Sequence, residues 1–296
     1  MDAPAAEGPN SPPACTVLRP KRQTVPLVLA SPHSGTWYPP AFLAQAALDR
    51  DTLRRSEDTF VDGLFADAPG LGAPLLCALY PRAYVDVNRE PYELDPGMFS
   101  DPLPPYANTT SPRVAAGLGT IARLVGAGAL IYRQPLPFAE ARRRIEALYR
   151  PYHATLAALI AETRARFGYC VLLDCHSMPS AGPDAAVQGA DVVLGDRHGL
   201  SCAAELTQVA ARVLSGAGLR VARNAPYAGG YTTGHYGRPT EGVHALQIEL
   251  SRRLYMDEQT HIPLASFGAL RALMARVVAA VAEVAPLSLL PRPPEA

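Results

Sequence analysis

Residues 169–177 read Y-C-V-L-L-D-C-H-S, and this stretch decides the fold class. Its apolar first half follows Gly168 and is rich in strand-forming residues, which predicts a buried central β-strand. Successive side chains of a strand point to opposite faces, so Asp174 and His176 are expected to share one face. A strand that ends in Asp-x-His is typical of a metal ligand with an orienting carboxylate beside it. The alternative is a histidine that is simply hydrogen-bonded at a strand end.

A second apolar stretch has the same form. Residues 25–30 (V-P-L-V-L-A) predict another strand, and His33 follows it within the sequence Ser-Pro-His-Ser-Gly. Ligands of open α/β sheets bind at the carboxyl ends of the strands. We therefore expect His33 and His176 to converge at one edge of the sheet.

Predicted strands and helices alternate along most of the chain. Further strands are expected over residues 75–79, 84–87, 191–194, 219–222 and 243–249. Helices are expected over residues 41–47, 57–66, 114–125, 138–167, 203–214 and 264–284, and Pro151 should kink or divide the longest of them. This alternation predicts a single α/β domain over residues 24–296, with a mixed β-sheet flanked by helices on both faces. Residues 1–23 are rich in proline and small residues, which predicts a disordered arm.

Composition argues against several classes of protein. Lys plus Arg and Asp plus Glu both number 27, so the chain lacks the basic excess of a nucleic-acid-binding protein. The cluster at residues 142–144 (Arg-Arg-Arg) is expected to lie on a solvated helix face. The N-terminus lacks the features of a secretory signal, and no run of about 18 apolar residues predicts a membrane span. Five cysteines without a CxxC pair predict reduced thiols, so we expect a cytoplasmic protein.

The two histidines are the starting point for a metal site. A catalytic zinc ion typically has three protein ligands and keeps a fourth position open. His33 and His176 would supply two ligands, and the third is expected from the acidic pair Glu57 and Asp58. These acids have an alternative role, because carboxylates in the first turn of a helix stabilise the helix dipole.

Glu249 stands out near the end of the predicted strand 243–249. Gln247 and Glu249 lie on one face of this strand, and an acid in such a strand is costly unless it is paired or used. Beside a metal site it would act as a general base on water and then return the proton to the departing nitrogen. The alternative is a salt bridge to Arg252 or Arg253.

Three polar residues between positions 82 and 89 form a further group. Arg89 is a candidate for binding a substrate carboxylate, because a guanidinium matches a carboxylate with two parallel hydrogen bonds, and Asn88 is placed to assist it. Arg82 is a candidate for stabilising a developing oxyanion. The alternative for each arginine is a surface ion pair.

Taken together, these stretches resemble the N-formylglutamate amidohydrolase family, whose members look like distant relatives of zinc carboxypeptidases and aspartoacylase. The resemblance runs in the family's order from position 31 to position 257 and so covers most of the chain. The matching stretches are S-P-H-S-G from Ser31, E-D-T-F-V-D from Glu57, P-R-A-Y-V-D-V-N-R from Pro81, L-D-C-H-S from Leu173, P-Y-A-G-G-Y-T-T-G-H-Y-G from Pro226 and L-Q-I-E-L-S-R-R-L-Y-M-D from Leu246.

The resemblance implies a zinc-carboxypeptidase-like (phosphorylase/hydrolase-like) fold that holds one zinc ion per chain. It selects Asp58 over Glu57 as the acidic ligand beside His33 and His176. It also implies that the loop over residues 229–237 closes over the substrate, with Tyr231 and His235 as contacts. One departure concerns this loop, because Gly234 stands where an arginine is expected after Tyr-Thr-Thr. The remaining roles implied are Glu249 as general base and acid, Arg82 as oxyanion stabiliser, and Asn88 with Arg89 as carboxylate ligands.

The reaction implied is hydrolysis of N-formyl-L-glutamate, or of a similar small N-acyl amino acid, to the amino acid and formate or another acid. A related zinc amidase or carboxypeptidase acting on a different acidic N-acyl compound is the nearest alternative. A metal-free protein that binds a small carboxylate through Arg89 and a zinc-stabilised structural domain are alternatives of other classes. No oligomeric state is predicted.

Overall fold

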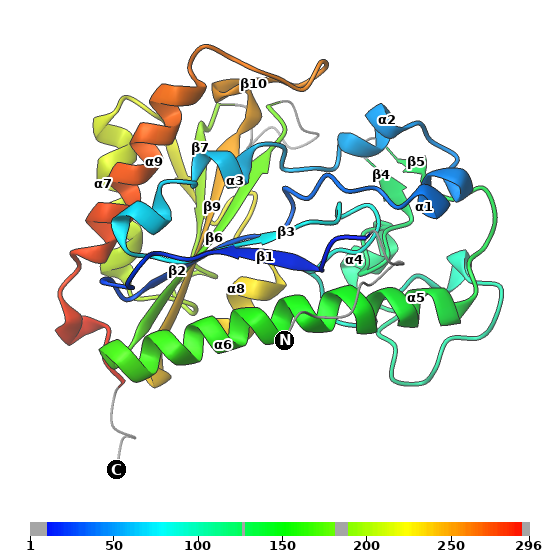
Figure 1. Cartoon of the computed structure of the whole chain (residues 1–296), viewed down its shortest axis with the longest axis horizontal. Helices are drawn as coiled ribbons and strands as arrows, with labels where there is room; N and C mark the ends of the chain where they lie inside the picture. The colour runs from blue at the N-terminus through cyan, green and yellow to red at the C-terminus, as the bar shows by residue number, and fades with distance from the viewer. Residues whose placement is uncertain (1–10, 126–127, 181–188, 292–296) are drawn as a thin grey trace. The chain divides into compact units, whose positions relative to one another are not determined.

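A computed structural model describes residues 11–125, 128–180 and 189–291 (Figure 1). Among these residues, seven strands form the main sheet in the order β1-β3-β2-β6-β9-β7-β8. Strands β2, β6 and β9 are parallel, whereas β7 is antiparallel to β9, so the sheet is mixed as predicted. The strands are β1 (Cys15–Leu18), β2 (Leu27–Ser31), β3 (Leu75–Ala78), β6 (Cys170–Met178), β7 (Val192–Gly195), β8 (Val221–Arg223) and β9 (Val243–Ser251).

Strand β6 is central, and all nine of its residues are buried. It pairs in parallel with β2 on one side and with β9 on the other. A strand with neighbours on both sides and helices on both faces must be apolar along most of its length, which is what residues 170–173 provide. The register places Ala30 opposite Asp174 and His176 opposite Glu249, so the polar ends of β2, β6 and β9 lie next to one another.

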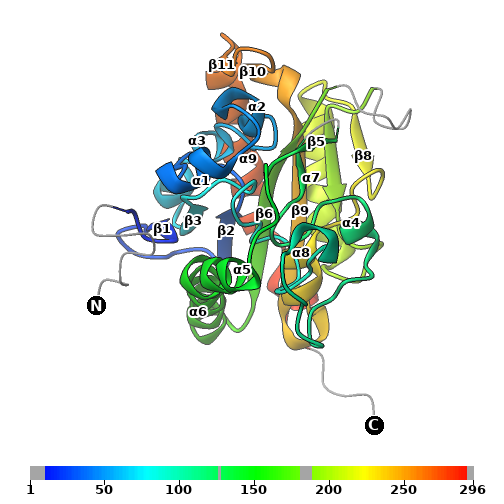
Figure 2. The same ribbon diagram turned by 90° about the vertical axis from the view of Figure 1, so that its right-hand side faces the viewer.

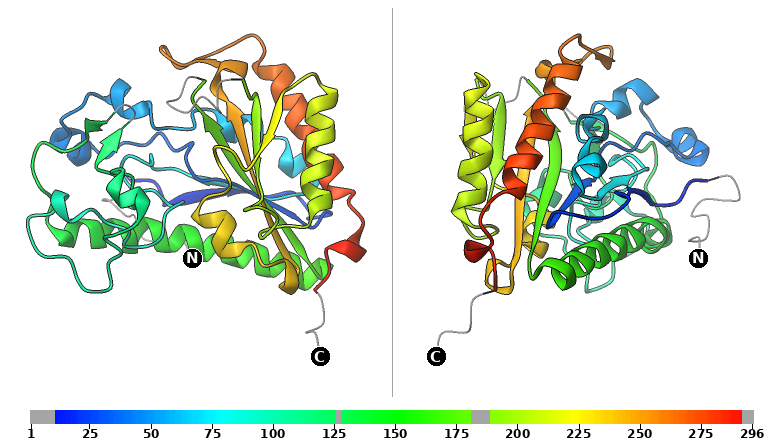
Figure 3. Two further views of the ribbon diagram at one scale, coloured as in Figure 1. Left: turned by 180° about the vertical axis from the view of Figure 1, so that it is seen from behind. Right: turned by 60° about the vertical axis from the view of Figure 1, so that its left-hand side comes forward.

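The chain is a single α/β domain whose residues divide into two compact units. The first unit comprises Met1–Thr16, Pro32–Thr59 and Cys77–Thr155, and the second comprises Val17–Ser31, Phe60–Leu76 and Leu156–Ala296. The second unit contains most of the main sheet. Its helices α7 and α9 pack side by side on one face of the sheet (Figure 3), and α8 lies on the other face against β9 (Figure 2). The bounds of these three helices are α7 (Ala204–Gly216), α8 (Tyr231–Tyr236) and α9 (Phe267–Ala282). The second unit also contains the short helix α3 (Val61–Leu64) and a small antiparallel pair of β10 (Met256–Asp257) and β11 (Ile262–Pro263).

The first unit consists largely of loops and short helices. Arg144 is fully buried in it, with its guanidinium 3.9 Å from the ring centroid of Tyr84, so the prediction that residues 142–144 are all solvated is wrong for this arginine. Glu140 accepts a hydrogen bond from Arg144 Nε (2.8 Å) and compensates the buried charge. The elements of this unit are α1 (Pro40–Gln45), α2 (Arg50–Arg54), α4 (Pro112–Ala115), β4 (Leu124–Val125), β5 (Ala129–Leu130) and α5 (Phe138–Arg144).

The long helix predicted over residues 138–167 is divided, as expected from Pro151. A π-helical segment (Ile145–Tyr149) separates α5 from α6 (Arg150–Phe167). Proline has no backbone N–H to donate to the preceding turn, and a π-helical turn is one way in which a helix accommodates that loss.

Four other local predictions are wrong. The predicted arm over residues 1–23 contains β1, although residues 1–10 lie outside the described part of the chain. Residues 84–87 form turns rather than a strand, and the predicted helix over 57–66 begins only at Val61, because Phe60 before it is left-handed (φ 66°). In place of the helix predicted over 114–125, the structure has the short α4 and β4.

Within the described residues, no helix is long and apolar enough to cross a lipid bilayer.

Candidate metal centre and active site

His33 is held in place by backbone and side-chain contacts just beyond β2. Its carbonyl accepts a hydrogen bond from the Asp58 backbone N–H (3.0 Å), which brings Asp58 alongside it. Gly35 packs so closely that any side chain there would collide with the Tyr80 carbonyl, which explains the glycine of Ser-Pro-His-Ser-Gly. His33 is 1% exposed, so each of its ring nitrogens must find a partner inside the protein.

Asp86 determines which ring nitrogen of His33 donates a hydrogen bond. Burial alone would raise the pKa of the Asp86 carboxyl, but the charges of Arg82 and Arg89, together with the hydrogen bond to His33, outweigh it and hold this pKa well below its usual range. An ionised carboxylate only accepts, so His33 Nε2 donates to Asp86 Oδ1 (2.7 Å). In the neutral imidazole this bond leaves the lone pair on Nδ1, which lies 3.3 Å from Asp58 Oδ2. Metal-binding histidines usually donate their other ring N–H to a carboxylate in this way.

His176 is placed by β6, and its neighbour Asp174 lies on the same face, as the alternation of the strand predicts. Nε2 of His176 lies 3.1 Å from Asp174 Oδ1, and both side chains are buried. One donor atom from each of His33, Asp58 and His176 lies within 4.8 Å of the other two. Two imidazoles and one carboxylate, all buried, fit the ligand set of a catalytic zinc ion.

The acidic pair is divided between two environments. Glu57 accepts hydrogen bonds from Tyr38 Oη (2.6 Å), Thr59 Oγ1 (3.0 Å) and Arg54 Nε (3.2 Å). These contacts direct Glu57 into its own network, whereas Asp58 joins His33 and His176. Of the two acids, the geometry therefore brings Asp58 to the candidate metal centre.

The predicted polar group at positions 82–89 forms around Asp86, a residue that we did not predict for the site. Arg82 donates from Nε (3.2 Å) and Nη2 (2.7 Å) to Asp86 Oδ2, and the Asn88 backbone N–H donates to Oδ1 (2.8 Å). Arg89 Nε lies 3.7 Å from the same carboxylate and donates to the Leu118 carbonyl (2.9 Å). Burial lowers the pKa of Arg89 to about 10, which still leaves the guanidinium charged at neutral pH.

Glu249 lies opposite His176 in the register of β6 and β9 and is 8% exposed. Gln247 Nε2 donates to Glu249 Oε1 (2.8 Å). Of the two arginines considered as salt-bridge partners for Glu249, Arg253 pairs with Asp191, and Arg252 Nε donates to Ser177 Oγ (3.2 Å).

The predicted loop residues Tyr231 and His235 both lie on α8 and contact each other. Their rings stack with centroids 4.9 Å apart, and Tyr231 Oη lies 3.2 Å from His235 Nδ1. Burial and the charge of Arg238 lower the pKa of His235, so its ring is neutral at neutral pH. A Cβ atom at position 234 would lie 3.0 Å from Arg197 Nη1. The guanidinium of Arg197 is therefore next to the space that a side chain at position 234 would enter.

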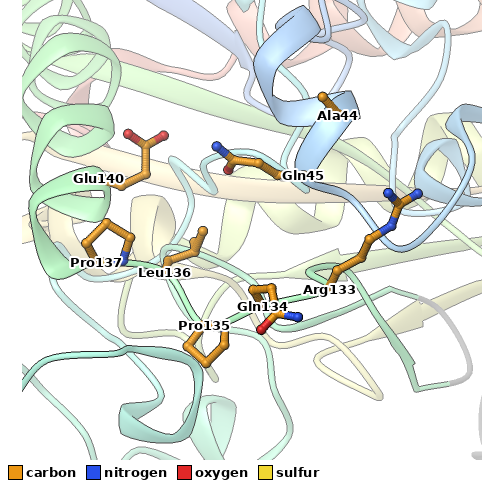
Figure 4. A pocket seen from close by; sticks show the side chains of 8 residues that line it. All are labelled: Ala44, Gln45, Arg133, Gln134, Pro135, Leu136, Pro137 and Glu140. Carbon is orange, nitrogen blue, oxygen red and sulfur yellow. The ribbon is translucent and has the colours of Figure 1, made fainter.

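A separate surface pocket of about 320 Å³ lies in the first unit (Figure 4). None of the predicted site residues lines it, so it is distinct from the candidate metal centre. Its lining combines polar side chains with prolines and consists of Ala44, Gln45, Arg133, Gln134, Pro135, Leu136, Pro137 and Glu140.

Known proteins resemble this chain over most of its length. The family profile of N-formylglutamate amidohydrolase matches residues 25–256. An N-formylglutamate deformylase of Pseudomonas aeruginosa is 36% identical over 249 residues, which make up 82% of this chain and 86% of that protein. A Pseudomonas putida protein of the same name is 31% identical over 240 residues, or 79% and 83% of the two chains.

A solved structure agrees with this assignment. The crystal structure of N-formylglutamate amidohydrolase from Ralstonia eutropha JMP134 matches with a TM-score of 0.85 and 38% identity, over 91% of this chain and 97% of that one. The mixed sheet and the buried His-Asp-His group define an α/β protein with a candidate metal centre. The chain belongs to the N-formylglutamate amidohydrolase family.

Proposed function

We propose that this protein is a zinc-dependent amidohydrolase that hydrolyses N-formyl-L-glutamate to L-glutamate and formate. Family membership and the names of the relatives support the reaction class and the substrate. The observation that carries the proposal is the buried group of His33, Asp58 and His176 with Glu249 opposite His176 in the sheet. This arrangement supports the proposal, because the three residues are of the types that bind catalytic zinc and the acid lies on the adjacent strand.

Our proposed metal ligands are His33 Nδ1, the Asp58 carboxylate and the His176 imidazole. A zinc ion held there supplies Lewis-acid polarisation of the formyl carbonyl and lowers the pKa of water at the site. Asp86 and Asp174 orient the two imidazoles, because each of these carboxylates lies beside a ring nitrogen of its histidine.

Glu249 is the proposed general base and acid. Its carboxylate removes a proton from the attacking water as the new carbon–oxygen bond forms, and later delivers that proton to the nitrogen of the breaking carbon–nitrogen bond. Formate and the free amino group of glutamate are the products, so the proton taken from water ends on the leaving group and Glu249 returns to its ionised form.

The proposed substrate contacts come from the group around Asp86 and from α8. Arg82 would stabilise the negative charge that develops on the formyl oxygen, and Arg89 with Asn88 would bind a substrate carboxylate. Asp86 holds the guanidinium of Arg82 through two hydrogen bonds, which limits its motion before the substrate arrives. Tyr231 and His235 are proposed as further contacts.

A related amidase acting on another acidic N-acyl compound is the second candidate, and Gly234 favours it. Position 234 carries no cation of its own, and the exposed Arg197 occupies the adjacent space, so the side-chain preference of this member can differ from that of its relatives. Rates of hydrolysis should be compared for N-formyl-L-glutamate, N-formyl-L-aspartate and N-acetyl-L-glutamate. We expect the highest kcat/KM and release of formate with N-formyl-L-glutamate; faster hydrolysis of another member of this panel would transfer the assignment to that compound.

Arg89→Lys is expected to raise KM for N-formyl-L-glutamate by roughly tenfold or more, with a smaller change in kcat. Lysine keeps the charge but cannot make two parallel hydrogen bonds to a carboxylate, and a lost bond to a charged group typically accounts for such a factor. Steady-state kinetics measure the effect, with the exposed Arg133→Lys as a matched control that should leave both constants unchanged. An unchanged KM for Arg89→Lys would remove Arg89 from substrate binding.

A further inference from the structure

The side chain of Gln247 connects Glu249 to the glycine-rich stretch that precedes α8. Both residues lie on β9 and face the same side, because they are two positions apart in the strand. Gln247 Nε2 donates to Glu249 Oε1 (2.8 Å), and the Gly230 backbone N–H donates to Gln247 Oε1 (2.7 Å). Gln247 is 3% exposed, so water has little access to this chain of contacts.

These two contacts determine the orientation of the Gln247 amide. A backbone N–H can only donate, so the amide atom that faces Gly230 must be the oxygen. The amide nitrogen is then directed at Glu249 Oε1, which accepts its hydrogen bond. A rotated amide would place two donors together at Gly230 and two acceptors together at Glu249, and both contacts would be lost.

The other end of this connection is α8. Gly230 is the residue immediately before α8, and Thr233 within the helix lies 3.4 Å from Asp174 Oδ2 and 3.5 Å from Gln247 Oε1 through its Oγ1. Asp174 is the carboxylate beside His176. The first turn of α8 is therefore joined both to the strand that carries the proposed base and to the strand that carries a proposed metal ligand.

We propose that Gln247 is a positioning residue for Glu249 and ties the conformation of the residues before α8 to the orientation of the base. This inference rests on the proposed function, in which Glu249 transfers the proton. The Gln247 Nε2 group has no lone pair to accept a hydrogen bond, so a proton on Glu249 Oε1 would face another donor. The proton taken from water therefore resides on Oε2, from which it is delivered to the leaving nitrogen.

Gln247→Met tests the inference, because methionine has nearly the same length and shape but no donor. We expect kcat to fall by about tenfold to hundredfold, the range for a lost hydrogen bond to a charged group, while KM and metal content stay within about twofold of wild type. Gln247→Glu is a second variant that keeps an acceptor for the Gly230 N–H and loses the donor, and it should lower kcat as well. The matched control is Thr207→Val, which removes the buried contact from Thr207 Oγ1 to Asp196 (3.0 Å) in the same unit and should leave kcat unchanged.

A double-mutant cycle separates positioning from a general loss of stability. In Glu249→Asp the carboxylate is shortened by one methylene group and cannot keep the contact with Gln247, so adding Gln247→Met should change kcat by less than about threefold. An equal loss of kcat in both backgrounds, or a wild-type kcat in Gln247→Met and Gln247→Glu, would overturn the inference. A wild-type kcat in Glu249→Asp and Glu249→Gln would instead overturn the proposed base, so the two failures can be told apart.

Discussion

Replacing Glu249 with glutamine is expected to remove nearly all turnover while the protein keeps its metal. Glutamine has the same size and can still contact Gln247, but it cannot take a proton from water at neutral pH. Loss of a general base typically lowers rates by about 10²–10⁴-fold, and here one residue serves as both base and acid. We therefore expect kcat to fall by at least about 10³-fold. KM should change little, because Glu249 is not proposed to bind the substrate in its ground state.

The measurement pairs formate release with elemental analysis of the same purified sample. Glu241→Gln is a suitable control, because Glu241 is an exposed glutamate in the same unit, and it should retain wild-type kcat. Normal turnover in Glu249→Gln would remove the base assignment. A loss of activity accompanied by loss of metal would show that Glu249 supports the metal centre rather than proton transfer.

Replacing His176 with alanine is expected to have the second large effect, because it removes one of three proposed ligands. Two remaining donors hold zinc much more weakly, so the purified variant should contain little metal and show activity near background. Asp174→Asn should have a graded effect of about 10–100-fold on metal affinity or activity, because this residue orients the imidazole without binding the ion.

Cys175→Ala is the matched control for these variants, since it changes the neighbouring residue of the same buried strand and should keep metal and activity. Thermal unfolding of all three variants distinguishes loss of metal from loss of fold. A His176→Ala protein that retains a full complement of zinc would show that the ion binds elsewhere.

The central part of the fold could be predicted from the sequence, because its strands are short apolar runs bounded by turn residues. Residues 169–177 became β6, and the alternation of side chains along it correctly placed Asp174 and His176 on one face. Residues 84–87 have a similar apolar composition but form turns, where Tyr84 stacks beneath the buried guanidinium of Arg144. That contact joins residues 60 positions apart, and local composition carries no signal for it.

In the candidate site, too, residues marked by a local pattern could be predicted, whereas residues defined by contacts between distant parts of the chain could not. His33 and His176 could be predicted because both follow apolar strands, and Glu249 because an acid is unusual in such a strand. The role of Asp86 depends on contacts with His33 and with two arginines, of which only the spacing of Arg82, Asp86 and Arg89 is visible locally. For Gln247 the sequence indicates the shared face with Glu249, but the contact with Gly230 arises only when α8 folds against β9.

The account depends on one cation bound by His33, Asp58 and His176, and anomalous diffraction at the zinc edge from crystals of the unmodified protein tests it most directly. We predict one strong peak per chain, within bonding distance of His33 Nδ1, an Asp58 oxygen and a His176 ring nitrogen, with Glu249 nearby. A zinc-loaded crystal with its peak elsewhere, or with no peak among these three residues, would contradict the proposed metal centre.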